Sequence, residues 1–243
     1  MSLHLGQTLR DARWSYLIVE DIETGSFTSN LFKAKILPRA PIRPPGQWAA
    51  IKFASEQKAF EMLKWEHKCY QNPVILSSSH LRTLYEGINL HGCSTPESSF
   101  CLAFEWMDCT PKNLSSDMYQ QRHVLHKSAS KAVLSALDIL KSQRLVHTDI
   151  KNDNIFISGV NEPIPTVKLG DLGLVRSEGF EDYPVQPLTM RAPEVWSGRG
   201  CFHCSDVWAF AVTLFDWIKP CVLGVNDMPQ GHWPQPWAMA KLL

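Results

Sequence analysis

The sequence predicts an α+β protein in which a sheet lobe precedes a helical lobe. Runs of strand character dominate the chain up to residue 107, and helical hydrophobic periodicity begins near residue 117. Strands that come first and helices that come later are typical of this fold class. With 44% hydrophobic and 20% charged residues, the 243-residue chain has the composition of a globular protein with a large core.

The first strands are expected to form an antiparallel meander. Residues 16–22 and 31–37 have strand character and are joined by a connection that carries Gly25. Residues 38–46 (PRAPIRPPG) are rich in proline, which cannot pair inside a sheet, so this stretch is expected to be an exposed loop. Residues 48–54 (WAAIKFA) form the next predicted strand.

A helix and a further strand complete the predicted sheet lobe. Residues 55–71 are predicted to be a helix, with Ser55 as its candidate N-cap. Hydrophobic residues recur in this helix near helical spacing: Phe60, Leu63 and Tyr70. A buried strand is expected within residues 96–107.

Two hydrophobic segments predict the helical lobe. Residues 129–142 form a helix with a broad apolar face, composed of Val133, Leu134, Leu137, Ile139 and Leu140. Residues 206–218 are apolar around nearly the whole helix and need cover on all sides. The apolar run in this segment is about half as long as a membrane span and contains Asp216, so a buried helix is expected.

Charge and cysteine content exclude several classes of protein. Twenty-four basic residues balance 24 acidic ones, so no net charge attracts nucleic acid or an anionic membrane, and neither is an expected partner. Seven cysteines without regular spacing do not indicate a disulfide framework, and the N-terminal residues lack the apolar core of a secretory signal. The sequence therefore indicates an intracellular protein, in the cytoplasm, the nucleus or both.

Polar residues interrupt the otherwise apolar stretch 145–157 (LVHTDIKNDNIFI). His147, Asp149, Lys151 and Asn154 follow the spacing HxDxKxxN, in a predicted loop between a helix and a short strand. Taken alone, such a loop could also be a network of side chains that cap turns.

Three further motifs accompany this loop. Lys52 lies in the strand WAAIKF, Asp171 begins the sequence DLG 17 residues after Asn154, and residues 192–194 read Ala-Pro-Glu. With the loop, these motifs resemble the VAIK, catalytic-loop, DFG and APE elements of the eukaryotic protein kinases. The stretch HTDIK is similar to the serine/arginine-rich protein kinase branch of that family.

The resemblance covers residues 16–218 approximately and implies a bilobal protein kinase-like fold. It implies an antiparallel sheet N-lobe and a mostly helical, incomplete C-lobe. The implied parts are an N-terminal arm (1–15), the N-lobe (16–107), a partial C-lobe (108–218) and a segment rich in proline and tryptophan (219–243). The last segment is too short for the three helices that the family packs there, so a truncated kinase domain is expected.

The resemblance also implies an activity, the transfer of the γ phosphoryl of ATP to a serine or threonine hydroxyl with Mg²⁺. Asp149 would accept the proton of the hydroxyl, and Lys151 would contact the transferring phosphate. Asn154 and Asp171 would bind Mg²⁺ through hard oxygen atoms. The protein substrate cannot be named from the sequence.

Nucleotide-binding residues follow from the same resemblance. Lys52 would contact the α and β phosphates and pair with a helix carboxylate, either Glu66 or, alternatively, Glu61. In the adenine slot, Ala50 would form the roof, Phe156 the floor and Phe104 the gatekeeper. The hinge would comprise Glu105, Trp106 and Met107. Plain core packing is the alternative role for each of these residues.

The chain departs from the family pattern at several positions. Glu23 and Thr28 replace the first and third glycines of the phosphate-covering loop, where only Gly25 is retained, so weaker nucleotide binding is expected. Thr148 replaces the arginine that usually pairs with a phosphorylated activation segment, so phosphorylation there is not the expected switch. Glu194 would lack the arginine partner that the missing helices carry.

Two other functions compete with the kinase prediction, and one further motif suggests a metal. The chain could be a pseudokinase or interaction module with weakened nucleotide binding. It could also be a kinase of the same fold that phosphorylates a small molecule. Cys201, His203 and Cys204 (CFHC) have a spacing that suggests zinc, but a second ligand pair is missing nearby.

Overall fold

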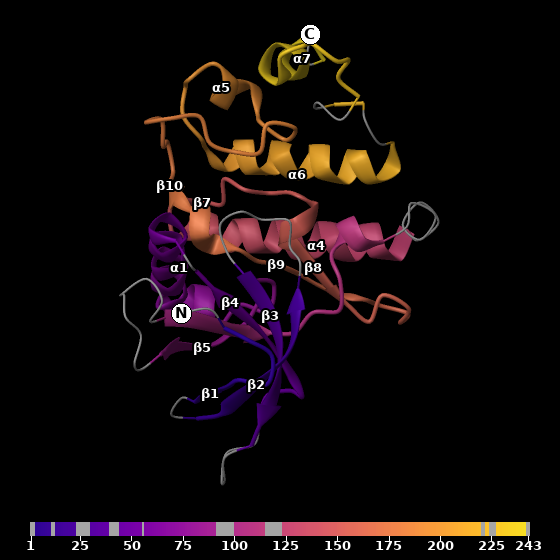
Figure 1. The fold of residues 1–243 in the computed structure, drawn as a ribbon. Coiled ribbons are helices and arrows are strands. Elements are labelled where there is room, and N and C mark those ends of the chain that lie inside the picture. The colour runs from indigo at the N-terminus through magenta and orange to yellow at the C-terminus, as the bar shows by residue number, and fades with distance from the viewer. Residues whose placement is uncertain are drawn as a thin grey trace. The chain divides into compact units, whose positions relative to one another are not determined.

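The computed structural model divides into two compact units. It describes residues 3–10, 13–22, 30–38, 44–54, 56–90, 100–114, 123–219, 222–223 and 227–241. Unit 1 comprises Met1–Ser77 and Arg82–Trp106, and unit 2 comprises Ser78–Leu81 and Met107–Leu243. A sheet dominates unit 1 and two long helices dominate unit 2 (Figure 1), which confirms the predicted α+β class with two lobes. Some positions singled out above lie outside the described residues: Glu23, Gly25, Thr28 and Ser55.

The described strands of unit 1 form one antiparallel sheet with the order β1-β2-β3-β4-β6-β5. Its strands are Thr8–Arg10 (β1), Ser15–Ile22 (β2), Asn30–Leu37 (β3), Trp48–Phe53 (β4), Leu84–Asn89 (β5) and Phe100–Glu105 (β6). Strands β2, β3 and β4 form the expected meander. The sequence did not predict β1 or β5, because β1 is very short and Gly87 weakens the strand signal of β5. A Cβ atom at Gly87 would lie 2.9 Å from His67 Nε2 and from Phe100 Cζ, so a larger residue would force these rings to shift.

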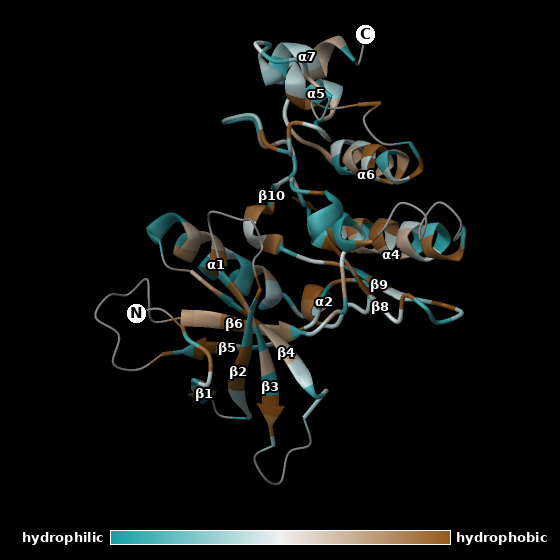
Figure 2. Cartoon of the chain, turned by 45° about the vertical axis from the view of Figure 1, so that its right-hand side comes forward, coloured by the Kyte–Doolittle hydropathy of each residue, from teal (hydrophilic) through white to brown (hydrophobic). Residues whose placement is uncertain are grey.

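Strand β3 shows how the alternating sequence divides between the two faces of the sheet. Phe32, Ala34 and Ile36 are buried in the hydrophobic core of unit 1. Lys33 and Lys35 alternate with them and therefore lie on the other face, as the two-residue period of a strand requires. Hydrophobic residues of β3 and β5 are brown in Figure 2.

A buried carboxylate links strands β2 and β5. The Tyr16 hydroxyl donates a hydrogen bond of 2.5 Å to Glu86 Oε1, and Arg13 Nε lies 3.7 Å from Glu86 Oε2. Replacing Tyr16 by Phe removes a donor to a buried charged group, so we expect the free energy of unfolding to fall by about 1–3 kcal/mol. Chemical denaturation would measure this change in the free energy of unfolding. The exposed Tyr183 provides the control, since Tyr183→Phe should change the same free energy by less than about 0.5 kcal/mol; equal effects of both variants would contradict the prediction.

Helix α1 (Gln57–Tyr70) confirms the helix predicted after β4. Phe60, Leu63 and Tyr70 are buried as predicted, and Tyr70 donates a hydrogen bond to the carbonyl of Arg82. Glu56 occupies the N-cap position without a side-chain hydrogen bond. A short helix, α2 (Pro73–Leu76), follows, and the Asn72 side chain caps it by accepting from the Val74 N–H.

Unit 2 contains two long helices and two small two-stranded sheets. Helices α4 (His123–Ser142) and α6 (His203–Ile218) lie side by side (Figure 1). Strands β7 (Leu145–Val146) and β10 (Arg176–Ser177) pair antiparallel, and so do β8 (Ile155–Ser158) and β9 (Thr166–Leu169). The shorter elements are η2 (Pro111–Asn113), η3 (Asn152–Asn154), η4 (Leu172–Leu174), α5 (Pro193–Trp196) and α7 (Pro234–Ala240).

Helix α4 contains the predicted helix, and three of the five residues predicted for its apolar face are buried, namely Val133, Leu137 and Leu140. Its buried residues are Leu125, Ala129, Ala132, Val133, Ala136, Leu137 and Leu140. Leu134, which was predicted to be buried, is 43% exposed, and Ile139 is only partly buried. The buried residues recur every three or four positions, and Leu134 and Ile139 point away from this stripe. Alanines, which the prediction passed over, complete the packed face.

Helix α6 is only partly covered within the described residues. Ala209, Phe210 and Trp217 are buried, whereas Val207 and Phe215 are exposed. The prediction of a buried helix is therefore correct for one face alone, and hydrophobic residues are visible along α6 in Figure 2. None of the helices in the described ranges combines the length and the hydrophobicity that crossing a membrane requires.

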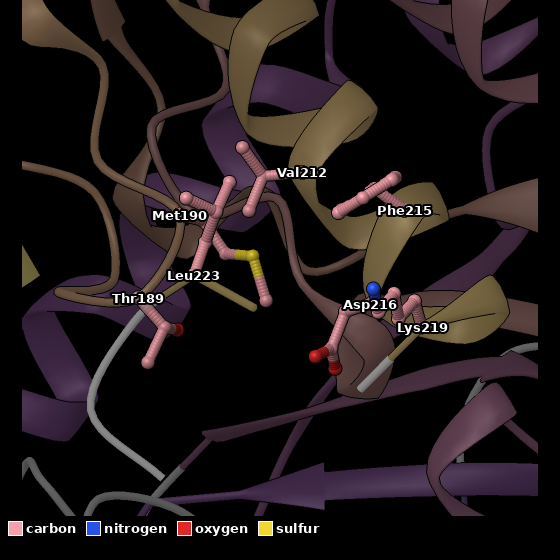
Figure 3. Close-up of a pocket in the computed structure, with 7 residues that line it drawn as sticks. All are labelled: Thr189, Met190, Val212, Phe215, Asp216, Lys219 and Leu223. Atoms are coloured by element: carbon pink, nitrogen blue, oxygen red, sulfur yellow. The ribbon is translucent and has the colours of Figure 1, made fainter. Parts of the chain in front are cut away.

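A small cavity lies between helix α6 and the segment before α5. Figure 3 shows the residues that line it: Thr189, Met190, Val212, Phe215, Asp216, Lys219 and Leu223. Its volume of about 10 Å³ is close to the minimum for one water molecule. The cavity is therefore too small to bind a nucleotide or a peptide side chain.

Candidate active site

The loop that carries the HxDxKxxN residues is held at both ends by strand pairing. Strand β7 precedes the loop and pairs with β10, and strand β8 follows it and pairs with β9. The turn that begins at Asp171 connects β9 to β10. The pairing therefore brings the loop and the Asp171 turn together, although they are separate in the sequence.

Asp206, at the beginning of helix α6, supports the loop through two hydrogen bonds. Only 1% of its surface is exposed, and its two carboxylate oxygens accept hydrogen bonds from the His147 N–H (2.6 Å) and the Thr148 N–H (3.0 Å). Burial raises the pKa of Asp206, and His147 and the two N–H groups oppose that effect. Sequence reasoning placed Asp206 in a helix and missed this contact; an acid in an apolar segment was the available signal.

His147 is fully buried and joins the loop to the Asp171 turn. Its Nε2 lies 3.0 Å from the Gly170 carbonyl oxygen, and its Nδ1 lies 3.3 Å from the Asp149 backbone nitrogen. Since Nδ1 must accept from that N–H, the network assigns the proton to Nε2, which donates to Gly170. Burial lowers the pKa of His147 and so favours this neutral form.

Asp149 is the central carboxylate of the loop. It is 7% exposed, and its Oδ2 accepts from Lys151 Nζ and from Asn154 Nδ2, both at 2.8 Å. Asn154 Nδ2 also donates to the Asp149 carbonyl oxygen at 2.7 Å. Burial raises the pKa of Asp149, Lys151 and Asn154 counteract it, and the nearby charge of Asp171 adds to it. The structure thus brings together the loop residues that the spacing singled out.

Asp171 and Asn154 offer oxygen atoms suited to a hard divalent cation. Asp171 has a left-handed backbone (φ 61°, ψ 73°) and caps η4 through a 3.4 Å hydrogen bond from the Gly173 N–H to its Oδ1. Because Asn154 uses Nδ2 toward Asp149, its Oδ1 is the atom suited to a metal. One carboxylate and one amide oxygen match the ligand preference of Mg²⁺, so the residues fit the implied ion.

Lys52 and Glu66 form an ion pair inside unit 1. Lys52 Nζ lies 2.8 Å from Glu66 Oε2, and the Glu66 side chain is 1% exposed. The alternative acid, Glu61, is exposed and accepts a hydrogen bond from Gln57. Glu61 lies five positions before Glu66 on α1, more than one helical turn away, so only Glu66 reaches the lysine.

The residues expected around the adenine are distributed over both units. In unit 1, Ala50 and Phe104 are buried cross-strand partners. The Glu105 N–H donates to the Thr83 carbonyl, and the Glu105 carboxylate accepts from the Thr83 N–H. The Glu105 carbonyl also accepts from Arg82 Nε at 3.1 Å. In unit 2, Met107 is buried and Phe156 is partly buried on β8.

A lysine that the sequence reasoning missed lies beside Ala50. Lys33 is the cross-strand partner of Ala50, and its ammonium group lies over two tryptophan rings, 4.9 Å from the centroid of Trp48 and 4.4 Å from that of Trp106. Both contacts are within the range of cation–π attraction. Lys33 therefore lies on the same face of the sheet as Ala50 and Lys52.

The Ala-Pro-Glu element is attached to the beginning of helix α6. Ser205 Oγ donates a 2.5 Å hydrogen bond to Glu194 Oε1, so Glu194 has a hydroxyl partner here. Gln186, with φ 69°, donates to the Ser205 carbonyl and accepts from the Ala192 N–H. Arg191 donates to the Gln186 carbonyl. These bonds hold the segment between Asp171 and α5 at its C-terminal end.

The CFHC stretch does not form a metal site. Among the described residues, no group of three or more His, Cys, Asp or Glu side chains is placed to hold a metal ion. Burial, with a contribution from Asp206, raises the pKa of the Cys201 thiol to about 12, which disfavours the thiolate that zinc requires. His203 instead lies 3.1 Å from Glu178.

Comparison with known proteins shows which family the chain resembles. The family model "Protein kinase domain" matches residues 42–223, three quarters of the chain. Serine/threonine-protein kinase D3 of Homo sapiens is 28% identical over 71% of the chain and 19% of its own length. The protein kinase US3 homolog of Psittacid herpesvirus 1 is 30% identical over 41% of the chain and 20% of its own length. Tyrosine-protein kinase JAK1 of Danio rerio is 32% identical over 40% of the chain and 9% of its own length.

The aligned segments thus cover a fifth or less of these relatives. The family match includes Lys52, the HxDxKxxN loop, Asp171 and the Ala-Pro-Glu element. The fold is accordingly that of a bilobal protein kinase, and the chain belongs to the protein kinase domain family.

Proposed function

We propose that this chain is a protein kinase that uses ATP and Mg²⁺ to phosphorylate a serine or threonine hydroxyl. The observation that carries the proposal is the arrangement around Asp149. A nearly buried carboxylate contacts a lysine and an asparagine, and a second carboxylate, Asp171, lies close enough to raise its pKa. A scaffold has no physical need to hold these groups together, whereas phosphoryl transfer needs each of them.

The residues of unit 2 would act on the hydroxyl and on the transferring group. Asp149 orients the hydroxyl and accepts its proton, and Lys151, which is partly exposed beside it, contacts the phosphoryl oxygens. Asn154 and Asp171 would hold the metal. Bound Mg²⁺ would neutralise charge on the phosphate oxygens. The neutral His147 fixes the position of the Gly170 carbonyl, directly before Asp171.

A second set of residues, which the family resemblance assigns to nucleotide binding, would hold the ATP. Lys52, held by Glu66, supplies a positive charge for the α and β phosphates. The apolar residues proposed for the adenine slot are Ala50, Phe104 and Phe156, with backbone contacts from Glu105 and Met107. Gly25 would allow the backbone to approach the phosphates closely. An ATP-dependent reaction is expected to take place inside the cell.

Serine or threonine specificity is supported by the relatives. Human kinase D3, which aligns with 71% of the chain, is named a serine/threonine-protein kinase, and so is US3 of Human herpesvirus 2. The Danio rerio relative is named a tyrosine-protein kinase and aligns with a smaller part of the chain. Transfer of labelled phosphate from ATP to acceptor peptides, followed by identification of the phosphorylated residue, tests the proposal; phosphate on tyrosine alone would overturn the specificity.

Metal-dependent nucleotide binding gives a second prediction. ATP with Mg²⁺ should raise the unfolding temperature, because a ligand at about 100 times its Kd stabilises the folded state by about 2.7 kcal/mol. Asp171→Asn should remove the part of this shift that depends on Mg²⁺, since an amide is a poorer ligand than a carboxylate. Asp182→Asn, a change of an exposed acid, is the matched control and should leave the shift intact. Differential scanning fluorimetry with and without Mg²⁺ measures both.

The alternative is a kinase fold that serves as an interaction module. Glu23 and Thr28 in the phosphate-covering loop favour this alternative, because a carboxylate would repel the triphosphate. An unchanged unfolding temperature at millimolar ATP, with and without Mg²⁺, together with no phosphate transfer, would support the module and overturn the enzyme.

A further inference from the structure

Thr148 has an unusual backbone conformation and a buried hydroxyl group. Its φ is 65°, and 2% of its surface is exposed. A β-branched residue in the left-handed region is rare and costs about 1–3 kcal/mol, so surrounding contacts must maintain it. Its N–H donates to Asp206, and its Oγ1 donates a 2.6 Å hydrogen bond to the carbonyl oxygen of Leu174.

The acceptor of this hydroxyl lies at the end of the Asp171 turn. Leu174 is the last residue of η4, the short helix that Asp171 caps. On the other side of Asp171, the Gly170 carbonyl is bonded to His147. Hydrogen bonds from adjacent loop residues, His147 and Thr148, therefore bracket Asp171.

A single carboxylate orients both donors of this bracket. The N–H groups of His147 and Thr148 donate to the two oxygens of Asp206, so helix α6 fixes the backbone from which both side chains project. Asp149 follows immediately in the chain. The bracket thus connects the carboxylate proposed to orient the hydroxyl with the carboxylate proposed to hold the metal.

The wider family has an arginine at the sequence position of Thr148, and that arginine pairs with a phosphate. The Thr148 hydroxyl instead binds a neutral carbonyl, so its contact needs no phosphate charge. Arg176 and Arg191, which follow Asp171, donate to the carbonyls of Val175 and Gln186. Backbone oxygens of the segment that follows Asp171 therefore hold both arginine side chains.

We propose that Thr148 is a positioning residue whose hydroxyl holds the Asp171 turn in its metal-binding conformation without a covalent phosphate. The inference deepens the proposed kinase function, and its activity readout rests on that function. A hydrogen bond to a carbonyl is neutral and present as soon as the chain folds. The turn is then ordered by the fold itself, and phosphatase treatment of the purified chain should leave its activity unchanged.

The test compares two substitutions that separate the hydroxyl from the side-chain shape. Thr148→Val keeps the β-branch and removes the hydroxyl, whereas Thr148→Ser keeps the hydroxyl and removes the methyl group. We expect Thr148→Val to raise the Mg²⁺ concentration for half-maximal transfer about 5- to 10-fold, which corresponds to the net contribution of one hydrogen bond. Thr148→Ser should stay within about twofold of the parent, because a hydroxyl restores the bond.

Thr213 on helix α6 provides a matched control for lost stability. It is a buried threonine whose Oγ1 donates to the Ala209 carbonyl within the same helix. Thr213→Val removes a hydroxyl from the same unit, and it should leave the Mg²⁺ requirement unchanged even if it lowers the unfolding temperature. An equal rise of the Mg²⁺ requirement in Thr213→Val and Thr148→Val would overturn the positioning role.

A readout without nucleotide separates this inference from the proposed function. Hydrogen–deuterium exchange of residues 172–177, measured without Mg²⁺ and ATP, should accelerate in Thr148→Val and not in Thr148→Ser or Thr213→Val. Unchanged exchange in Thr148→Val would overturn the tether even in an active enzyme. Faster exchange in a chain that transfers no phosphate would support the tether and count against the kinase activity alone. Loss of activity after phosphatase treatment would overturn the claim that no phosphate is needed.

Discussion

Replacing Asp149 by Asn is expected to lower the rate of phosphate transfer by about 10²- to 10⁴-fold, the usual contribution of a general base. The amide keeps the shape of the side chain and can still accept from Asn154, but it cannot take a proton from the substrate. The KM for ATP should change little, because Asp149 is not a proposed phosphate contact. Steady-state kinetics with labelled ATP would measure both constants.

Asp153 provides the control for this substitution. It lies in the same loop, its side chain is 41% exposed, and it pairs with Lys112 at 2.8 Å. Asp153→Asn removes one carboxylate from the loop without changing the proposed chemistry, so its transfer rate should stay within a few-fold of the parent. Equal losses in the two variants would show that loop charge, and not proton transfer, governs the rate.

The same Asp149→Asn variant should unfold at a higher temperature than the parent near pH 7. Burial raises the pKa of Asp149 above its value in the unfolded chain, about 3.9. The folded state thus binds the proton more tightly, and ionisation makes it less stable. The destabilisation caused by ionisation of Asp149 is absent when the pH lies below the pKa that this carboxyl has in the unfolded chain. It grows as the pH rises toward the pKa of Asp149 in the folded protein, and it is complete above that pKa. Asparagine is neutral throughout, so its advantage should disappear as the pH approaches 4.

Thermal unfolding in buffer without metal and nucleotide, at several pH values, checks this dependence. A variant that is both less active and more stable cannot owe its lost activity to unfolding, which makes the pair of measurements informative. A lower unfolding temperature for Asp149→Asn at pH 7 would contradict the expected sign.

Replacing Asp206 by Ala is expected to reduce the free energy of unfolding by about 2–5 kcal/mol. The change leaves the N–H groups of His147 and Thr148 buried without their acceptor, at about 1–3 kcal/mol each. Transfer should also fall, because the loop that carries Asp149 loses its support. Chemical denaturation and a transfer assay below the unfolding transition would measure the two effects.

Asp206→Asn distinguishes the hydrogen bonds from the charge. Both oxygens of Asp206 accept from N–H groups, so the amide keeps one acceptor and turns a donor toward the other N–H. The loss should therefore be intermediate. Asp149→Asn differs, because a single oxygen of Asp149, Oδ2, accepts from both Lys151 and Asn154. Asp138 on α4 is exposed, and Asp138→Asn should change stability by less than about 0.5 kcal/mol. An Asp206→Ala variant as stable as this control would refute the supporting role.

Features that depend on nearby residues were predictable. The alternation of β3 and the helical spacing of α1 are local, and the structure contains both elements. The contacts of Asp149 with Lys151 and Asn154 join residues within five positions of one another. Their spacing in the sequence was therefore sufficient to single them out.

Features that depend on distant residues were not predictable in the same way. Leu134 was assigned to the core, yet it lies outside the stripe that α4 buries. The strand β5 was missed, since its glycine is explained only by the rings of His67 and Phe100. The choice of Glu66 over Glu61 depended on which turn of α1 lies against β4.

The fold class, the family resemblance and the polar residues of the HxDxKxxN loop follow from the order of residues along the chain. The support of this loop by Asp206 and its connection through Thr148 to the Asp171 turn became visible in the folded protein alone. Asp206 and Thr148 are 58 positions apart, and Thr148 and Leu174 are 26 positions apart. Periodicity and motif spacing describe which residues share a face or a loop, whereas such hydrogen bonds form only when strand pairing and helix packing bring distant segments together.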